Sequence, residues 1–97
     1  MHLIVRPEAE ADIDAAFDWY EDQEPGLGAE FIRSVDAALA SVERQPHAYP
    51  VIYRTARRAL LRRFPYAVFY LVQNYAVEVV ACMHFKRHPR RWRLRVR

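Results

Sequence analysis

The sequence predicts an α+β domain in which an antiparallel pair of helices packs on a small, mainly antiparallel β-sheet. Helical periodicity dominates the first half of the chain, and runs rich in valine and aromatic residues dominate the second half. The resulting order is β-α-α-β-β-β, and helices and strands that do not alternate favour the α+β class. The 97 residues have room for one such domain. We place it at residues 1–92, followed by a basic C-terminal tail at 93–97.

Proline and glycine bound the two predicted helices. The segment 2–6, HLIVR, is typical of a short strand, and the proline that follows it suits the first turn of a helix. The stretch 7–23, PEAEADIDAAFDWYEDQ, combines one apolar stripe with an acidic face. The sequence EPGLG at 24–28 then interrupts the helix, and apolar residues recur at helical spacing over 31–42. So short a link predicts an antiparallel helix hairpin.

Three strand-like runs occupy the second half: RRALLRR at 57–63, YAVFYLVQ at 66–73 and YAVEVVACMH at 75–84. We expect a hairpin turn at Gln73-Asn74, because asparagine tolerates positive φ. The run YAVFYLV is apolar on both faces of its strand. Since one helix hairpin covers one face of a sheet, either the C-terminal segment folds back over the second face or another chain covers it.

The charge of the chain is unevenly distributed. Residues 1–45 hold 11 acids and 3 arginines, whereas residues 46–97 hold one acid and 12 lysines or arginines. Such asymmetry suggests a surface for an anionic partner, although the acidic helices could also neutralise the basic strands within the fold. The single cysteine, Cys82, indicates a reducing compartment, and the chain shows neither a signal peptide nor a membrane-spanning run. We expect a cytoplasmic protein with no membrane partner.

The residues give no reason to expect a metal or cofactor. Cys82, His84 and His88 could ligate a metal, but structural zinc needs a second ligand pair that the sequence lacks. Aromatic residues at helical or strand spacing are more often core than base-stacking platforms. We assign these to the core: Phe17, Phe31, Phe64 and Phe69. Trp19 beside the helix link would contact a partner if exposed.

Five stretches carry a family resemblance: RPEAEADID, WYEDQEPGLGAEF, QPHAYPVIYR, RRALLRRFPYAVFY and HFKRHPRRW. They occur in order over roughly residues 4–92, and together they resemble the RelE/ParE superfamily of bacterial type II toxins. The similarity is greatest to the ParE-like, plasmid-stabilisation branch. The resemblance implies the β-α-α-β-β-β fold expected above. It also implies a small toxin encoded beside an antitoxin that folds against it and silences it.

The two branches of the superfamily imply different targets. ParE-like toxins poison DNA gyrase through protein contact, whereas RelE-like toxins enter the ribosomal A site and cleave mRNA. Arg57, Arg63 and Arg87 resemble cationic positions of the ribonucleases, and His84 could serve as acid or base. Trp92 stands where the ribonucleases often place a tyrosine, and its indole cannot transfer a proton. We expect a gyrase inhibitor; the alternatives are a ribosome-dependent mRNA endonuclease and a non-toxic antitoxin-binding module.

The arginines near the C-terminus suggest the contact surface. Arginine pairs well with both carboxylates and phosphates. We expect one basic surface that an antitoxin with acidic and apolar residues neutralises and that the free toxin presents to gyrase or RNA. The residues expected to contact target or antitoxin are Trp19, Arg57, Arg63, Arg87, Arg90, Arg91 and Trp92. A homodimer or a toxin–antitoxin hetero-oligomer would be compatible with this expectation.

Overall fold

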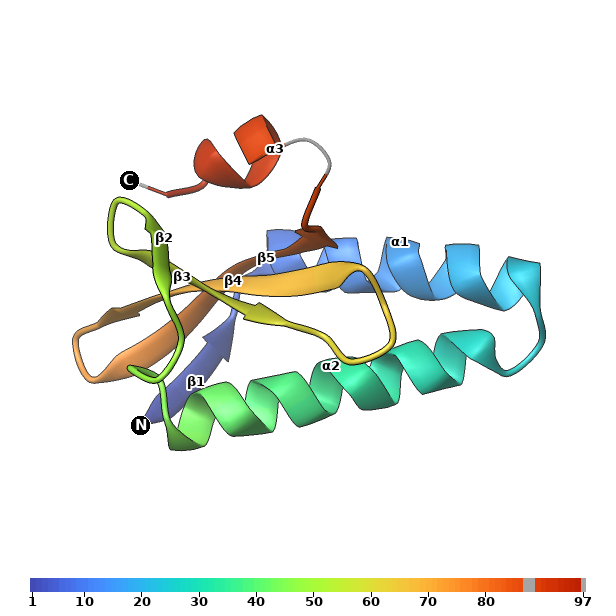
Figure 1. The fold of residues 1–97 in the computed structure, drawn as a ribbon, viewed down its shortest axis with the longest axis horizontal. Helices are drawn as coiled ribbons and strands as arrows, with labels where there is room; N and C mark the ends of the chain where they lie inside the picture. Colours follow the sequence, from blue (N-terminus) through green and yellow to red (C-terminus); the bar gives the residue numbers. More distant parts are fainter. Residues whose placement is uncertain (87–88, 97) are drawn as a thin grey trace.

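The structure, a computed structural model, describes residues 1–86 and 89–96. Its elements, in chain order, are β1 (His2–Val5), α1 (Pro7–Gln23), α2 (Leu27–Arg44), β2 (Val51–Tyr53), β3 (Ala56–Leu60), β4 (Tyr66–Gln73), β5 (Ala76–His84) and α3 (Pro89–Arg93). The strands form one sheet in the order β1-β5-β4-β3-β2. Figure 1 shows α1 and α2 on one side of the sheet and α3 on the other.

The predicted α+β class is confirmed. Only β1 runs parallel to its neighbour β5; the other pairs are antiparallel. The structure adds two short elements to the predicted order, the strand β2 and the helix α3. The strand β2 has only three residues, which are too few to show the two-residue period of a strand. The helix α3 buries only Trp92, and this single apolar residue among arginines gives no helical pattern.

The link between α1 and α2 depends on one carboxylate and two glycines. Glu21 accepts hydrogen bonds from the backbone N–H groups of Gly26 and Gly28, each at 2.9 Å. These bonds satisfy donors that the first turn of α2 leaves without helical partners. Gly26 has φ of +92°, and a Cβ on Gly28 would lie 2.8 Å from the ring of Phe17. The helix hairpin therefore closes tightly at this end.

The sheet is apolar on both faces, as its sequence pattern indicates. The helix-facing core includes Tyr20, Phe31, Val68, Tyr70 and Val79. The opposite core includes Ala67, Phe69, Leu71, Trp92 and Val96. The ring of Trp92 stacks on that of Phe69, with centroids 4.4 Å apart and planes at 15°. The C-terminal segment therefore covers the second face, which confirms one of the two arrangements expected for it.

An ion pair holds that C-terminal segment in place. The Arg95 guanidinium donates to both oxygens of the Asp12 carboxylate, at 2.7 and 3.2 Å, and to the carbonyl of Val80 at 3.0 Å. Asp12 also accepts the backbone N–H of Cys82 at 3.0 Å. The sequence pattern places Arg95 and the buried Val96 in a basic tail, but they lie against the domain. The segment is ordered against the domain because Val96 is buried and Arg95 pairs with Asp12, which is distant in the sequence.

The hairpin between β4 and β5 turns one residue later than expected. Asn74 and Tyr75 both have positive φ, at 51° and 60°. Two consecutive residues in this conformation suit a two-residue hairpin turn, and asparagine tolerates it well. Tyr75 takes the second position of this turn, and its side chain is 89% exposed.

No helix within the described part of the chain is long and apolar enough to span a membrane.

Candidate functional site: the groove between α2 and β3

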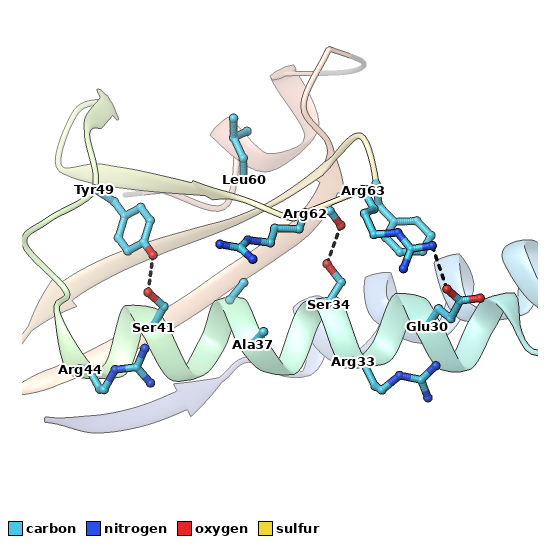
Figure 2. A pocket seen from close by; sticks show the side chains of 12 residues that line it. Glu30, Arg33, Ser34, Ala37, Ser41, Arg44, Tyr49, Leu60, Arg62 and Arg63 are labelled. Atoms are coloured by element: carbon cyan, nitrogen blue, oxygen red, sulfur yellow. Dashed lines mark hydrogen bonds and ion pairs between the residues drawn. The ribbon is translucent and has the colours of Figure 1, made fainter.

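A groove of about 490 Å³ runs between α2 and the end of β3 (Figure 2). The turn from β3 to β4 and the loop before β2 complete its walls. Its lining residues are Glu30, Arg33, Ser34, Ala37, Ala38, Ser41, Arg44, Tyr49, Leu60, Arg62, Arg63 and Phe64. Figure 2 shows Arg62 and Tyr49 reaching toward α2 from the opposite wall.

The groove combines apolar and cationic chemistry. Apolar lining comes from Ala37, Ala38, Tyr49 and Phe64, and positive charge from Arg33, Arg44, Arg62 and Arg63. The single lining acid, Glu30, pairs with Arg63 at 3.0 Å. Leu60 borders the groove at the end of β3, but its side chain points away from α2 (Figure 2) and is 52% exposed. A ligand that fits these walls needs both apolar groups and carboxylates or other anions.

Hydrogen bonds fix the walls of the groove. Ser34 on α2 donates to the carbonyl of Arg62 at 2.8 Å, and Ser41 is hydrogen-bonded to the hydroxyl of Tyr49 (Figure 2). Arg57 donates to the carbonyl of Tyr49 at 2.6 Å. These contacts tie the helix to the sheet and to the loop before β2. The groove is therefore preformed.

The buried phenol of Tyr70 also fixes the loop before β2. Tyr70 on β4 donates its hydroxyl to the carbonyl of Pro46 at 2.6 Å. Burial raises the pKa of Tyr70 to about 12, against an opposing effect of the nearby Arg57 charge. The hydroxyl thus stays protonated and keeps donating across the physiological pH range.

The sheet edge beside the groove is open. The register pairs β2 with Ala56 and Arg57, so within the described residues the far half of β3 extends beyond its edge neighbour. The N–H of Leu61 points to Tyr66 of β4. Because backbone groups alternate in direction along a strand, those of Leu60 point outward, along the groove. An edge of this kind can pair with an added strand.

The structure does not bring the expected basic residues together on one surface. Arg57 faces the helix layer, bound to backbone carbonyls, and Arg63 pairs with Glu30 of α2. Arg90 and Arg91 lie on α3, across the sheet. Arg87 lies outside the described residues.

The remaining predicted site residues occupy other places. Trp19 is 56% exposed on α1, whereas Trp92 is buried against the sheet. His84 ends β5 and accepts the N–H of Lys86 on Nδ1 at 3.2 Å. His84 and Arg91 share a second hollow of about 270 Å³. Among the described residues no three metal-ligating side chains come together.

Sequence reasoning missed the groove itself. Its helical wall carries Arg33, Ala37 and Arg44, at i, i+4 and i+11 along α2. That spacing follows one helix face, and it was a usable signal. The opposite wall could not be predicted from the sequence, because it depends on where the loop before β2 and the turn after β3 fold back.

The fold and this groove define a small α+β domain with a groove beside an open strand edge, and comparison with known proteins assigns its family. Residues 3–89 match the family described as the ParE toxin of the type II toxin–antitoxin system parDE, so the chain belongs to the ParE toxin family. Toxin ParE2 of Mycobacterium tuberculosis, from strains CDC 1551 and H37Rv, is 28% identical over 88 residues. The match covers 90% of this chain and 84% of the relative.

A solved structure shares the fold. The structure entitled "Chromosomal ParDE TA system from P. aeruginosa" superposes with a TM-score of 0.78 at 18% sequence identity. The superposition covers 87% of this chain and 95% of that one. The architecture is therefore preserved where most side chains differ.

Proposed function

We propose that this ParE-family toxin inhibits DNA gyrase through protein contact, and that a cognate antitoxin silences it by filling the α2–β3 groove. Family membership supports the assignment as a toxin of a type II system. The solved structure of a ParDE toxin–antitoxin system with this fold supports the expectation of an antitoxin partner. Gyrase is the target that the resemblance to the ParE branch implies.

The groove beside an open strand edge is the observation that carries the antitoxin proposal. An extended peptide could pair with the backbone of Leu60 while placing apolar side chains toward Ala38 and Phe64. Acidic side chains of the same peptide would meet Arg33 and Arg44 at the rim. The chemistry is that of a segment which mixes acidic and apolar residues.

Among the candidate catalytic groups that the structure describes, dispersal supports inhibition by contact over RNA cleavage. Cleavage needs a base, an acid and cations that converge on one phosphate. Arg57 and Arg63 are engaged on the helix side of the sheet, while His84 lies at the end of β5. Trp92 is 4% exposed and stacked on Phe69. These residues do not surround a common point.

A charge reversal in the groove tests the antitoxin proposal. We expect Arg33→Glu with Arg44→Glu to weaken binding of the antitoxin encoded beside the toxin by at least about tenfold, because two attractive contacts become repulsive. Calorimetry on the purified proteins measures the affinity, and gyrase supercoiling in vitro measures toxicity. The matched control, Arg90→Glu with Arg91→Glu on α3, should bind antitoxin normally. Equal weakening in both double variants would refute the groove as the binding site.

A further inference from the structure

A second surface lies across the sheet from the groove, where the β2–β3 hairpin approaches α3. We call it the hairpin–α3 face and define it by Tyr53, Arg54, Arg58, Arg90 and Arg93. From its charge and its geometry we infer that it binds the phosphate backbone of duplex DNA. The inference does not depend on which protein the toxin inhibits.

The face is strongly and uniformly positive. The segments that form it, 51–60 and 89–93, contain no acidic residue. Arg54, Arg90 and Arg93 are exposed, and none of the four arginines forms an ion pair within the described part of the chain. The acids of the molecule lie mainly on α1 and α2, across the sheet. The guanidinium groups of Arg54, Arg90 and Arg93 are therefore available to an external anion.

One buried donor on this face is unsatisfied. The Nε of Arg58 is buried and has no acceptor among the described residues. Arg58 lies opposite Phe69 in the β3–β4 register, on the side of the sheet that Trp92 covers. A buried donor without a protein partner is uncommon in native structures, and such a donor often binds an anion or an ordered water.

The aromatic rings of this face are already in contact with protein. The guanidinium carbons of Arg93 and Arg54 lie 4.9 and 5.5 Å from the centre of the Tyr53 ring. The Trp92 ring meets Tyr53 edge-on at 5.8 Å and stacks on Phe69 with its own face. Proteins that bind single-stranded nucleic acids need exposed aromatic rings on which bases can stack. This arrangement instead favours contacts from arginine to backbone phosphates.

The surface is also concave. Tyr53, Pro89, Arg90, Arg93 and Leu94 line a hollow of about 350 Å³. Figure 1 shows α3 and the β2–β3 turn on the same side of the molecule. Guanidinium groups held over a ring keep their N–H donors at the edge, where they can pair with two phosphate oxygens. The face thus offers preoriented donors on two separate elements, Arg54 on the β2–β3 turn and Arg93 on α3.

Fluorescence anisotropy with a labelled 20-base-pair DNA duplex tests the inference on the full chain. We expect Arg54→Gln with Arg93→Gln to weaken binding about tenfold or more at 100 mM salt, and to lower the slope of log K against log salt by roughly 2, as two lost phosphate contacts require. The matched control, Arg33→Gln with Arg44→Gln, removes the same charge from the groove across the sheet. It should leave affinity within about twofold. Circular dichroism and thermal unfolding verify that both double variants fold.

Several outcomes would overturn the inference. One is the absence of duplex binding by the wild-type chain at 50 mM salt. Another is an equal loss of affinity in the two double variants, because binding would then follow net charge. A third is preferential binding of a single-stranded 20-mer that the Arg54 and Arg93 substitutions leave unchanged. Loss confined to the hairpin–α3 variant, with the expected salt slope, supports it.

Discussion

Removal of the Asp12 carboxylate should loosen the C-terminal segment and destabilise the whole domain. The side chains of Asp12 and Arg95 are 12% and 20% exposed, and two of the bonds between them are 2.7 and 3.2 Å long. Loss of one partner from a buried ion pair costs about 3–5 kcal/mol, and an abandoned backbone donor, here the N–H of Cys82, costs about 1–3 kcal/mol. Residual exposure and relaxation reduce the sum, so we expect Asp12→Ala to cost about 3 kcal/mol.

Urea unfolding followed by tryptophan fluorescence measures this change. Trp19→Phe removes the exposed indole, so the signal then reports Trp92, which belongs to the C-terminal segment and stacks on Phe69 of the sheet. For a domain of this length, the expected loss lowers Tm by roughly 12–24 °C. Asp14→Ala, an exposed acid on the same helix, is the control and should change stability by less than about 0.5 kcal/mol. An Asp12→Ala effect under about 1 kcal/mol would refute the assigned role of the ion pair.

Three further predictions concern other parts of the domain. Hydrogen bonding by Arg6 is the main cause that lowers the pKa of Glu78 below its usual 4.5. The ionised carboxylate therefore stabilises the fold above pH 4.5, and this stabilisation is lost as the pH falls through the lowered pKa. Glu78→Gln should flatten the acid limb of a curve of stability against pH, and an unchanged acid limb would contradict this role of Glu78. Burial, with a smaller effect of Asp12, raises the pKa of the Cys82 thiol to about 12. Mass spectrometry should therefore show that iodoacetamide labels Cys82 of the folded protein at pH 8 at least about 100-fold more slowly than it labels the protein unfolded in urea. Comparable labelling rates in the two states would disprove the burial of Cys82. Gly28→Ala should cost about 1–3 kcal/mol in urea unfolding, because its Cβ would press on the Phe17 ring; a neutral result would show that the hairpin relaxes freely.

The elements that repeat a clear period could be predicted from the sequence. The helix 7–23 was expected within its observed bounds, because a proline opens it and a proline–glycine link closes it. The apolar alternation of 66–72 on both faces also predicted that something must cover the second side of the sheet. Periodicity and chain breakers depend on local sequence alone, which explains this success.

Contacts between distant parts of the chain could not be predicted in the same way. The pairing of Asp12 with Arg95 joins residues 83 positions apart, and nothing local distinguishes either from its charged neighbours. Arg57 and Arg90 likewise lie in basic runs, yet the fold places them on opposite sides of the sheet. The candidate site depends on where the fold places such residues. The cationic and apolar chemistry of the site could therefore be predicted from the sequence, but its position between α2 and β3 could not.

The most direct test of the central proposal is induced expression of the chain in a permissive bacterial host, with and without the adjacent antitoxin gene. Plasmid supercoiling and mRNA integrity are scored in the same cultures. The proposal predicts lost supercoiling with intact mRNA, and recovery of supercoiling when the antitoxin is co-expressed. Cleaved mRNA with normal supercoiling would contradict inhibition of gyrase and would make His84 the first residue to substitute.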